Sequence, residues 1–220
     1  MSAVLAPARF GAGGEEPWAA ALQGGPARLE LVPMGSPADS EPLDLRRWTA
    51  EADAADLVAL AGLTGPLLDI GCGPGRMVRA ALDAGLPAWG VDADPAAVAT
   101  CRASGLPVLR RSVFDRLPLE GTWSALLLLD GNIGIGGDVE TLLARCAALL
   151  HRGGALVVEV HPDPTRDVAA LWQVRGAAGS SDPFPWSQAG LPALLRAAHD
   201  FDLDDVRELG GRSFARLRAH

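Results

Sequence analysis

Residues 67–76, with the sequence LLDIGCGPGR, constrain the fold of this chain more than any other segment. An apolar run is followed by three glycines in alternate positions, which predicts a buried strand, a tight turn and the start of a helix. Because glycine lacks a Cβ, a ligand can approach the backbone of such a turn closely. The spacing Gly-x-Gly-x-Gly is one residue shorter than the Gly-x-Gly-x-x-Gly dinucleotide pattern. The segment therefore predicts an α/β fold with a ligand site where this strand ends.

Asp69 lies two residues before the first glycine, on a strand that is otherwise apolar. A carboxylate at this turn would repel a pyrophosphate at close range and attract an ammonium group. S-adenosylmethionine carries an ammonium and a sulfonium group and has no phosphate, so it suits such a site. The alternative is that Asp69 only accepts backbone hydrogen bonds from the turn.

Aspartates follow the apolar runs of this region at a regular interval. Asp69, Asp92 and Asp115 are each 23 residues apart, and Asp130 directly follows the apolar residues 125–129. In a parallel sheet the carboxyl ends of the strands share one edge, where ligands bind in open α/β folds. At the tip of the second strand, Asp92 is placed to accept hydrogen bonds from a ribose diol.

The segment 68–75 resembles the first motif of the class I S-adenosylmethionine-dependent methyltransferases almost residue for residue, and the resemblance extends over about residues 63–159. It implies a doubly wound, mostly parallel seven-stranded sheet of Rossmann-like type, with one antiparallel strand at the edge. Residues 203–217, which turn at Gly210 and Gly211, are predicted to form the hairpin that closes the sheet. Residues 129–138 are similar to those of a bacterial subgroup of this family.

The resemblance also implies S-adenosylmethionine as the cofactor and indicates which residues bind it. Asp69, Gly71 and Gly73 would line its methionine end, Asp92 would hold the ribose, and Phe114 with Asp115 would flank the adenine. The full set of expected cofactor-binding residues is Asp69, Gly71, Cys72, Gly73, Gly75, Asp92, Ala93, Phe114, Asp115 and Asp130.

Methyl transfer is an in-line displacement that depends mainly on position, although an oxygen or nitrogen nucleophile also needs a base. His161 directly follows the predicted strand 155–160 and is the best candidate base, with Asp130 as a second. Asn132 is expected to orient a polar group of the substrate, and Phe184 and Trp186 to form the wall of an apolar pocket. The chain lacks the Asn-Pro-Pro-aromatic pattern that follows the fourth strand in relatives that methylate amide or nucleobase nitrogens, and this disfavours those substrates. We expect a small-molecule acceptor that is methylated on oxygen or nitrogen.

Two other functions remain open at this point. One is an NAD(P)-dependent Rossmann oxidoreductase, which the short glycine spacing and Asp69 disfavour. The other is a noncatalytic S-adenosylmethionine-binding protein, because the sequence contains no unmistakable catalytic base.

The composition of the chain indicates which classes of binding partner are disfavoured. The net charge of −8 argues against nucleic acid, since affinity for phosphates needs clustered basic residues. No apolar run reaches the length of a membrane span, and residues 1–7 lack the features of a signal peptide, so a cytoplasmic protein is expected. The three cysteines form no Cys-x-x-Cys pair, so no metal site is predicted. No pattern indicates an oligomeric state.

The chain of 220 residues is long enough for one substantial core. We expect an N-terminal arm over residues 1–48, which covers the cofactor site, and a methyltransferase domain over residues 49–220. The arm is predicted to contain a short helix at 18–22 and a hairpin that pairs 28–32 with 43–45. Apolar spacing predicts further helices at 54–60, at 139–150 behind Asp138, at 168–172 and at 191–198.

Overall fold

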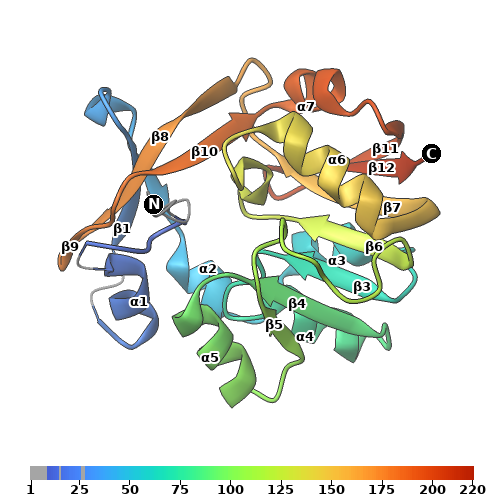
Figure 1. The fold of residues 1–220 in the computed structure, drawn as a ribbon, viewed down its shortest axis with the longest axis horizontal. Helices are drawn as coiled ribbons and strands as arrows, with labels where there is room; N and C mark the ends of the chain where they lie inside the picture. The colour runs from blue at the N-terminus through green and yellow to red at the C-terminus, as the bar shows by residue number, and fades with distance from the viewer. Residues whose placement is uncertain (1–8, 15, 26–27) are drawn as a thin grey trace, which may run out of the picture.

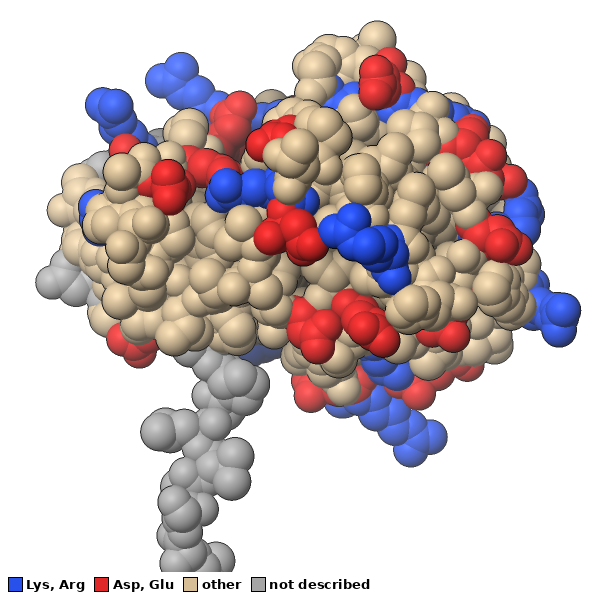
Figure 2. Space-filling view, turned by 90° about the horizontal axis from the view of Figure 1, so that it is seen from above, with Lys and Arg blue, Asp and Glu red and all other residues tan. Residues whose placement is uncertain are grey.

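The computed structural model describes residues 9–14, 16–25 and 28–220, which form two β-sheets and their flanking helices (Figure 1). Residues 1–7, on which the signal-peptide prediction was based, lie outside these ranges. Within the described ranges, no helix has the length and apolar character needed to cross a membrane. On the face shown in Figure 2, acidic and basic side chains are interspersed among uncharged ones.

The larger sheet has seven strands in the order β11-β12-β7-β6-β3-β4-β5. The strands are β3 (Leu67–Ile70), β4 (Ala88–Asp92), β5 (Val108–Arg110), β6 (Trp123–Leu128), β7 (Leu150–Val160), β11 (Phe201–Leu209) and β12 (Arg212–Ala219). Strands β3 to β7 are parallel, and β12 runs antiparallel to both β7 and β11. The predicted mostly parallel sheet with a closing hairpin is therefore confirmed, and the reversed strand lies one place inside the edge.

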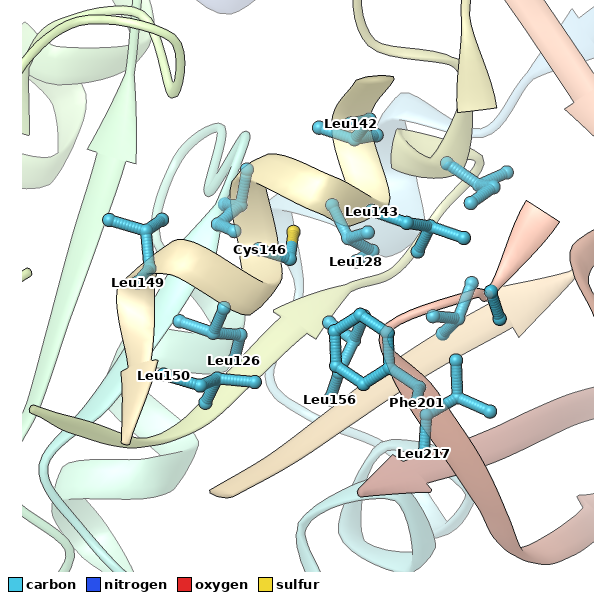
Figure 3. Packing of buried hydrophobic residues seen from close by; sticks show 14 of the residues in the cluster. Leu126, Leu128, Leu142, Leu143, Cys146, Leu149, Leu150, Leu156, Phe201 and Leu217 are labelled. Atoms are coloured by element: carbon cyan, nitrogen blue, oxygen red, sulfur yellow. The ribbon is translucent and has the colours of Figure 1, made fainter. Parts of the chain in front are cut away.

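Helices cover both faces of this sheet because its strands are apolar on both sides. Alternate residues of each strand face opposite helices, so Leu67 and Leu127 pack with α3 (Ala54–Leu60) and α4 (Arg76–Asp83). On the other face, Leu126 and Leu128 pack with α6 (Val139–Leu149), as Figure 3 shows, and with α7 (Leu191–Ala197). Helix α5 (Pro95–Ala103) follows β4.

Aspartates begin several of these helices by accepting backbone hydrogen bonds in the first turn. Asp94 accepts from the N–H groups of Ala96 and Ala97 at 2.8 Å, and Asp138 accepts from Thr141 at 3.2 Å. The helices predicted at 54–60, 139–150 and 191–198 are confirmed within one residue at each end.

The smaller sheet is antiparallel and joins the N-terminal part of the chain to a segment between β7 and α7. Its strands follow the order β10-β8-β1-β2, and β9 pairs with β8. The strands are β1 (Leu29–Pro33), β2 (Glu41–Leu43), β8 (Asp167–Gly176), β9 (Gly179–Ser180) and β10 (Phe184–Ala189). The predicted N-terminal hairpin is confirmed, with Leu29 opposite Leu43 and the short 3-10 helix η1 (Pro37–Asp39) between the strands. Its second strand is 41–43 and not 43–45, because Asp44 caps the helix that begins at Leu45.

Two short helices accompany this sheet. Helix α1 (Pro17–Leu22), predicted from the sequence, packs Trp18 on the strands, and α2 (Leu45–Thr49) follows β2. The sheet pairs strands from both sides of the predicted domain boundary at residue 48, and that boundary stays a prediction.

The prediction of a helix at 168–172 is wrong, because this segment belongs to β8. Along β8, Trp172 and Val174 are buried while Leu171 is 53% exposed. This period-two alternation is typical of a half-buried strand, whereas the helical interpretation required Leu171 to face the core. The residues that follow β8 contain β9 and the start of β10.

Candidate functional site

A cavity of about 1250 Å³ lies at the carboxyl ends of the parallel strands and is closed on its other side by residues of the smaller sheet. Nearly all the sequence-predicted site residues line it, including the four aspartates at strand ends. The predicted residues in its lining are Asp69, Gly71, Cys72, Gly73, Asp92, Ala93, Phe114, Asp115, Asp130, Asn132, His161 and Trp186.

Gly75 and Phe184 do not belong to this lining. Gly75 precedes α4 with φ of +96°, and a Cβ there would lie 2.5 Å from Leu106 and 2.7 Å from the Cys101 sulfur. It therefore serves close packing behind the turn. Phe184 is fully buried in the core of the smaller sheet.

Asp92 connects the end of β4 to the glycine turn after β3. Its Oδ2 accepts a hydrogen bond from the Gly73 N–H and its Oδ1 accepts one from the Asp94 N–H, both at 2.8 Å. Burial raises the pKa of Asp92 to about 6, although these two hydrogen bonds act in the opposite direction. A carboxylate that lines the cavity and is fixed in this way can accept hydrogen bonds from a diol.

Asp69 is 3% exposed at the end of β3. Burial raises its pKa well above the usual range, and the nearby negative charge of Asp130 adds to this. A cation bound beside Asp69 would stabilise its ionised form. The side chain is thus suited to the ammonium group of a methionine moiety.

Asn132 holds the glycine turn from the side of β6. Its Nδ2 donates to the carbonyl oxygens of Ile70 and Gly71, each at 2.9 Å. Gly71 has φ of +69°, and a Cβ there would lie 2.8 Å from Asn132 Nδ2. The amide of Asn132 therefore fixes the turn, and the geometry favours this role over the predicted contact with a substrate.

Phe114 and Asp115 lie in the turn that follows β5. The Phe114 ring packs over Gly136, where a Cβ would lie 2.8 Å from Cε2, and the side chain is 42% exposed. Asp115 Oδ2 accepts from the Ser112 N–H at 2.9 Å and so closes the turn. With Ala93, these residues form the cavity wall near Asp92.

Asp130 stands in a network of ion pairs. Its carboxylate binds Arg47 at 2.5 Å and Arg212 at 3.4 Å, and it also pairs with Arg76. Its own N–H donates to Glu159 Oε2 at 2.7 Å. Burial raises the pKa of Asp130, while the three guanidinium groups act in the opposite direction. Because both carboxylate oxygens are paired with arginines, the geometry favours a structural role for Asp130 over the predicted catalytic one.

The same network extends away from the cavity to Asp56, which is fully buried on α3. Asp56 pairs with Arg76 and, at 2.7 Å, with Arg212, which also reaches Glu159 at 2.7 Å. Sequence reasoning missed this network because its members are far apart in the chain. The one local signal was Arg76 directly after the glycine turn.

His161 follows β7, and both of its ring nitrogens face protein groups. Nδ1 accepts from the Asp163 N–H at 3.1 Å, so the neutral ring carries its proton on Nε2. Nε2 lies 3.6 Å from Glu41 Oε1 on β2. Glu41 also accepts from Gln188 Nε2 at 2.8 Å and from Arg166 at 3.3 Å. Glu41 and Gln188 line the cavity, and no sequence motif marks them.

Aromatic rings line the side of the cavity formed with the smaller sheet. Phe10 lies 5.2 Å from Trp186 and 5.6 Å from Trp18, measured between ring centroids. Trp48 lies 5.4 Å from Trp18. Of this group, only Trp186 was expected from the sequence.

Comparisons with known proteins agree with this fold. A methyltransferase-domain family model matches residues 68–158, and no curated protein matches the chain. A solved S-adenosylmethionine-dependent methyltransferase from Bacteroides fragilis, in complex with S-adenosylhomocysteine, is 19% identical, covers 93% of each chain and has a TM-score of 0.76. The 1,6-didemethyltoxoflavin-N1-methyltransferase of Burkholderia thailandensis is 23% identical over 78% of this chain and 80% of its own, with a TM-score of 0.57. CalS10, an amino pentose methyltransferase from Micromonospora echinaspora, is 19% identical over 76% of this chain and 87% of its own, with a TM-score of 0.55.

Residues 68–158 match a methyltransferase domain, and the chain has the fold of solved S-adenosylmethionine-dependent methyltransferases. The cofactor of that family is S-adenosylmethionine. The residues present fit this cofactor. Asp69 is a buried carboxylate beside a turn whose Gly73 has open space where a Cβ would stand, and Asp92 supplies fixed acceptor oxygens one strand away.

Proposed function

We propose that the protein methylates an oxygen or nitrogen atom of a small-molecule acceptor, which binds between the two sheets. The observation that carries this proposal is the size and shape of the cavity. Sites for a single drug-sized ligand have volumes of about 300 to 1,000 Å³. At about 1250 Å³, the cavity has room for an acceptor beside the cofactor.

The residues that line the cavity divide it into a cofactor end, at the strand ends of the larger sheet, and an acceptor end, at the smaller sheet. In the proposal, Asp69 binds the ammonium group of the cofactor, Asp92 the ribose hydroxyls, and Phe114 with Asp115 the adenine. Bound in this way, S-adenosylmethionine supplies a methyl group that is already activated by its sulfonium. The other end, lined by the smaller sheet, is left for the acceptor.

Two of the structurally similar enzymes act on small molecules according to their names, a didemethyltoxoflavin and an amino pentose, which supports an acceptor of this size. The net charge of −8 and the interspersed charges of Figure 2 support the exclusion of nucleic acid. A cytoplasmic location stays a prediction.

Isothermal titration calorimetry with S-adenosylhomocysteine and with NAD tests the cofactor end. We expect S-adenosylhomocysteine to bind and NAD to give no heat of binding. Transfer of tritium from methyl-labelled S-adenosylmethionine to a panel of small phenols, amines and amino sugars, with duplex DNA and RNA as comparison substrates, tests the acceptor. Label transfer confined to the nucleic acids would overturn the small-molecule proposal.

A further inference from the structure

We propose that Glu41 of β2 receives the proton of the methyl acceptor, and that this acceptor is a planar, largely apolar molecule with one N–H or O–H group directed at Glu41. The inference rests on the proposed function and deepens it. It assigns a substrate class to the far end of the cavity and a base that sequence reasoning did not find.

The substrate class follows from the cavity wall opposite the glycine turn. Phe10, Trp18, Trp48 and Trp186 line this wall together with Leu31, and successive rings of the group lie 5.2 to 5.6 Å apart. Aromatic walls favour planar apolar ligands through offset-stacked and edge contacts. A polar sugar would leave its hydroxyl groups unpaired against such a surface.

The choice of base follows from the carboxylates in the described lining. Most of them are committed to backbone N–H groups or to arginines, namely Asp44, Asp92, Asp94, Asp115, Asp130 and Glu159. Asp69 lies beside the glycine turn at the cofactor end. Glu41 also pairs with an arginine, Arg166, at 3.3 Å, but it stands on the smaller sheet, at the end of the cavity proposed for the acceptor.

The hydrogen bonds around Glu41 leave one acceptor position open. An ionised carboxylate has about four lone-pair positions. Three donors face them: Gln188 at 2.8 Å, Arg166 at 3.3 Å and His161 Nε2 at 3.6 Å. The side chain is 37% exposed, so the fourth position is accessible to an acceptor N–H or O–H.

The same contacts change the role of His161. Its Nδ1 is occupied by the Asp163 N–H, and its Nε2 carries the proton that faces Glu41. A ring in this state has no free lone pair with which to take a proton. His161 is therefore a positioning residue, which holds the carboxylate of Glu41 together with Gln188.

The proton balance is simple. A bond forms between the acceptor heteroatom and the methyl carbon, and the carbon–sulfur bond breaks with its electron pair left on sulfur. The acceptor loses one proton, which passes to a carboxylate oxygen of Glu41. After the methylated product leaves, Glu41 releases this proton to water.

The test uses protein loaded with S-adenosylhomocysteine and the probes 2-naphthol, 6-aminoquinoline and 2-methoxynaphthalene, with cyclohexanol as a nonaromatic control. We expect calorimetry to show 2-naphthol binding at least tenfold more tightly than its methyl ether, and cyclohexanol not binding. The preference for 2-naphthol over the ether should disappear in Glu41→Leu. Equal affinity for 2-naphthol and its ether, or a preference that survives Glu41→Leu, would overturn the proposal.

Turnover of the bound probes with labelled S-adenosylmethionine tests the base. Glu41→Gln should lower kcat by about 100-fold, the lower range for general-base catalysis, and change the affinity for S-adenosylhomocysteine less than threefold. His161→Gln, which keeps a donor, should retain more turnover than His161→Ala. Unchanged kcat in Glu41→Gln, equal losses in the two His161 variants, or no transfer to any bound probe would contradict the inference.

Glu51→Gln is the matched control, because Glu51 is exposed and lies outside the cavity lining. A different result would contradict the proposed function itself, namely wild-type protein that does not bind S-adenosylhomocysteine at all. Normal binding of S-adenosylhomocysteine with any of the contradicting probe results would remove only the present inference.

Discussion

Asp92 and Gly73 are joined by a hydrogen bond of 2.8 Å from the Gly73 N–H to Asp92 Oδ2, which fixes the glycine turn to the neighbouring strand. The carboxylate thus fixes the turn that is proposed to bind the cofactor, and it also lines the cavity in which the ribose is proposed to lie. Loss of this one side chain would disturb both.

We therefore expect Asp92→Ala to weaken the binding of S-adenosylhomocysteine by about 1.5 to 3 kcal/mol, the range for a lost hydrogen bond to a charged group. Calorimetry of the two proteins measures the difference. Asp83→Ala is a suitable control, because Asp83 is exposed and lies outside the cavity lining. An affinity equal to that of wild type would exclude Asp92 from the site.

Binding should also depend on pH. The pKa of Asp92 is raised to about 6, and a ribose diol donates hydrogen bonds to the ionised form. The affinity for S-adenosylhomocysteine should therefore fall as the pH drops through 6, to about one tenth of its pH 7.5 value at pH 5. In Asp92→Asn this component of the pH dependence should vanish, and an identical profile in both proteins would contradict the assignment.

The same raised pKa affects stability with the opposite sign. The protonated carboxyl is favoured in the folded state, so the stability that Asp92 contributes is fully present below the unfolded-state pKa near 3.8 and is lost as the pH rises through 6. Urea unfolding without ligand should show wild type losing stability relative to Asp92→Asn between pH 4 and 7. A constant difference between the two proteins would show that the pKa is not raised.

Gly71→Ala should destabilise the protein more than Gly85→Ala. Both glycines have φ between +69° and +80°, so both alanines incur the strain of a left-handed backbone, about 1 to 2 kcal/mol. Only Gly71 also faces Asn132 at 2.8 Å, whereas the space at Gly85 is open. Urea unfolding should show an additional loss of about 1 to 3 kcal/mol for Gly71→Ala. Equal losses would mean that the Asn132 contact does not constrain the turn.

Arg47→Ala should loosen the attachment of α2 to the larger sheet. The Arg47 guanidinium lies 2.5 Å from Asp130 and is 29% exposed, so its loss leaves a mostly buried carboxylate with one partner fewer. We expect a loss of about 1 to 2 kcal/mol in unfolding free energy, below the value for a fully buried pair. Arg46→Ala, at an exposed neighbouring position, is the control and should be neutral.

The larger sheet could be predicted from sequence because its evidence is local. The strand–turn–helix pattern around Gly71 and the apolar runs that end near Asp92 and Asp130 each need only a short window of sequence. The residues that these windows predicted for the cofactor lie, except Gly75, in the lining of the cavity, and their contact with the cofactor stays a prediction.

The smaller sheet could be predicted only in part. Leu29 pairs with Leu43 across a hairpin, which is a local contact. Leu29 also pairs with Gly176, and the periodicity of the sequence does not indicate which distant segment a strand will pair with. Residues that depend on this pairing were missed for the same reason. Glu41 on β2 lies 3.6 Å from His161, which follows β7 of the other sheet, and the two residues are far apart in the chain.

Because the cavity is lined by two sheets, changes in acceptor specificity and changes in binding of the methyl donor fall on different parts of the chain. In the proposed function, substitutions on β2 and β10 change which acceptors fit, while the strand ends proposed to bind the methyl donor belong to the other sheet. A lineage of such proteins can diversify its chemistry by remodelling one wall and leave the shared donor machinery untouched.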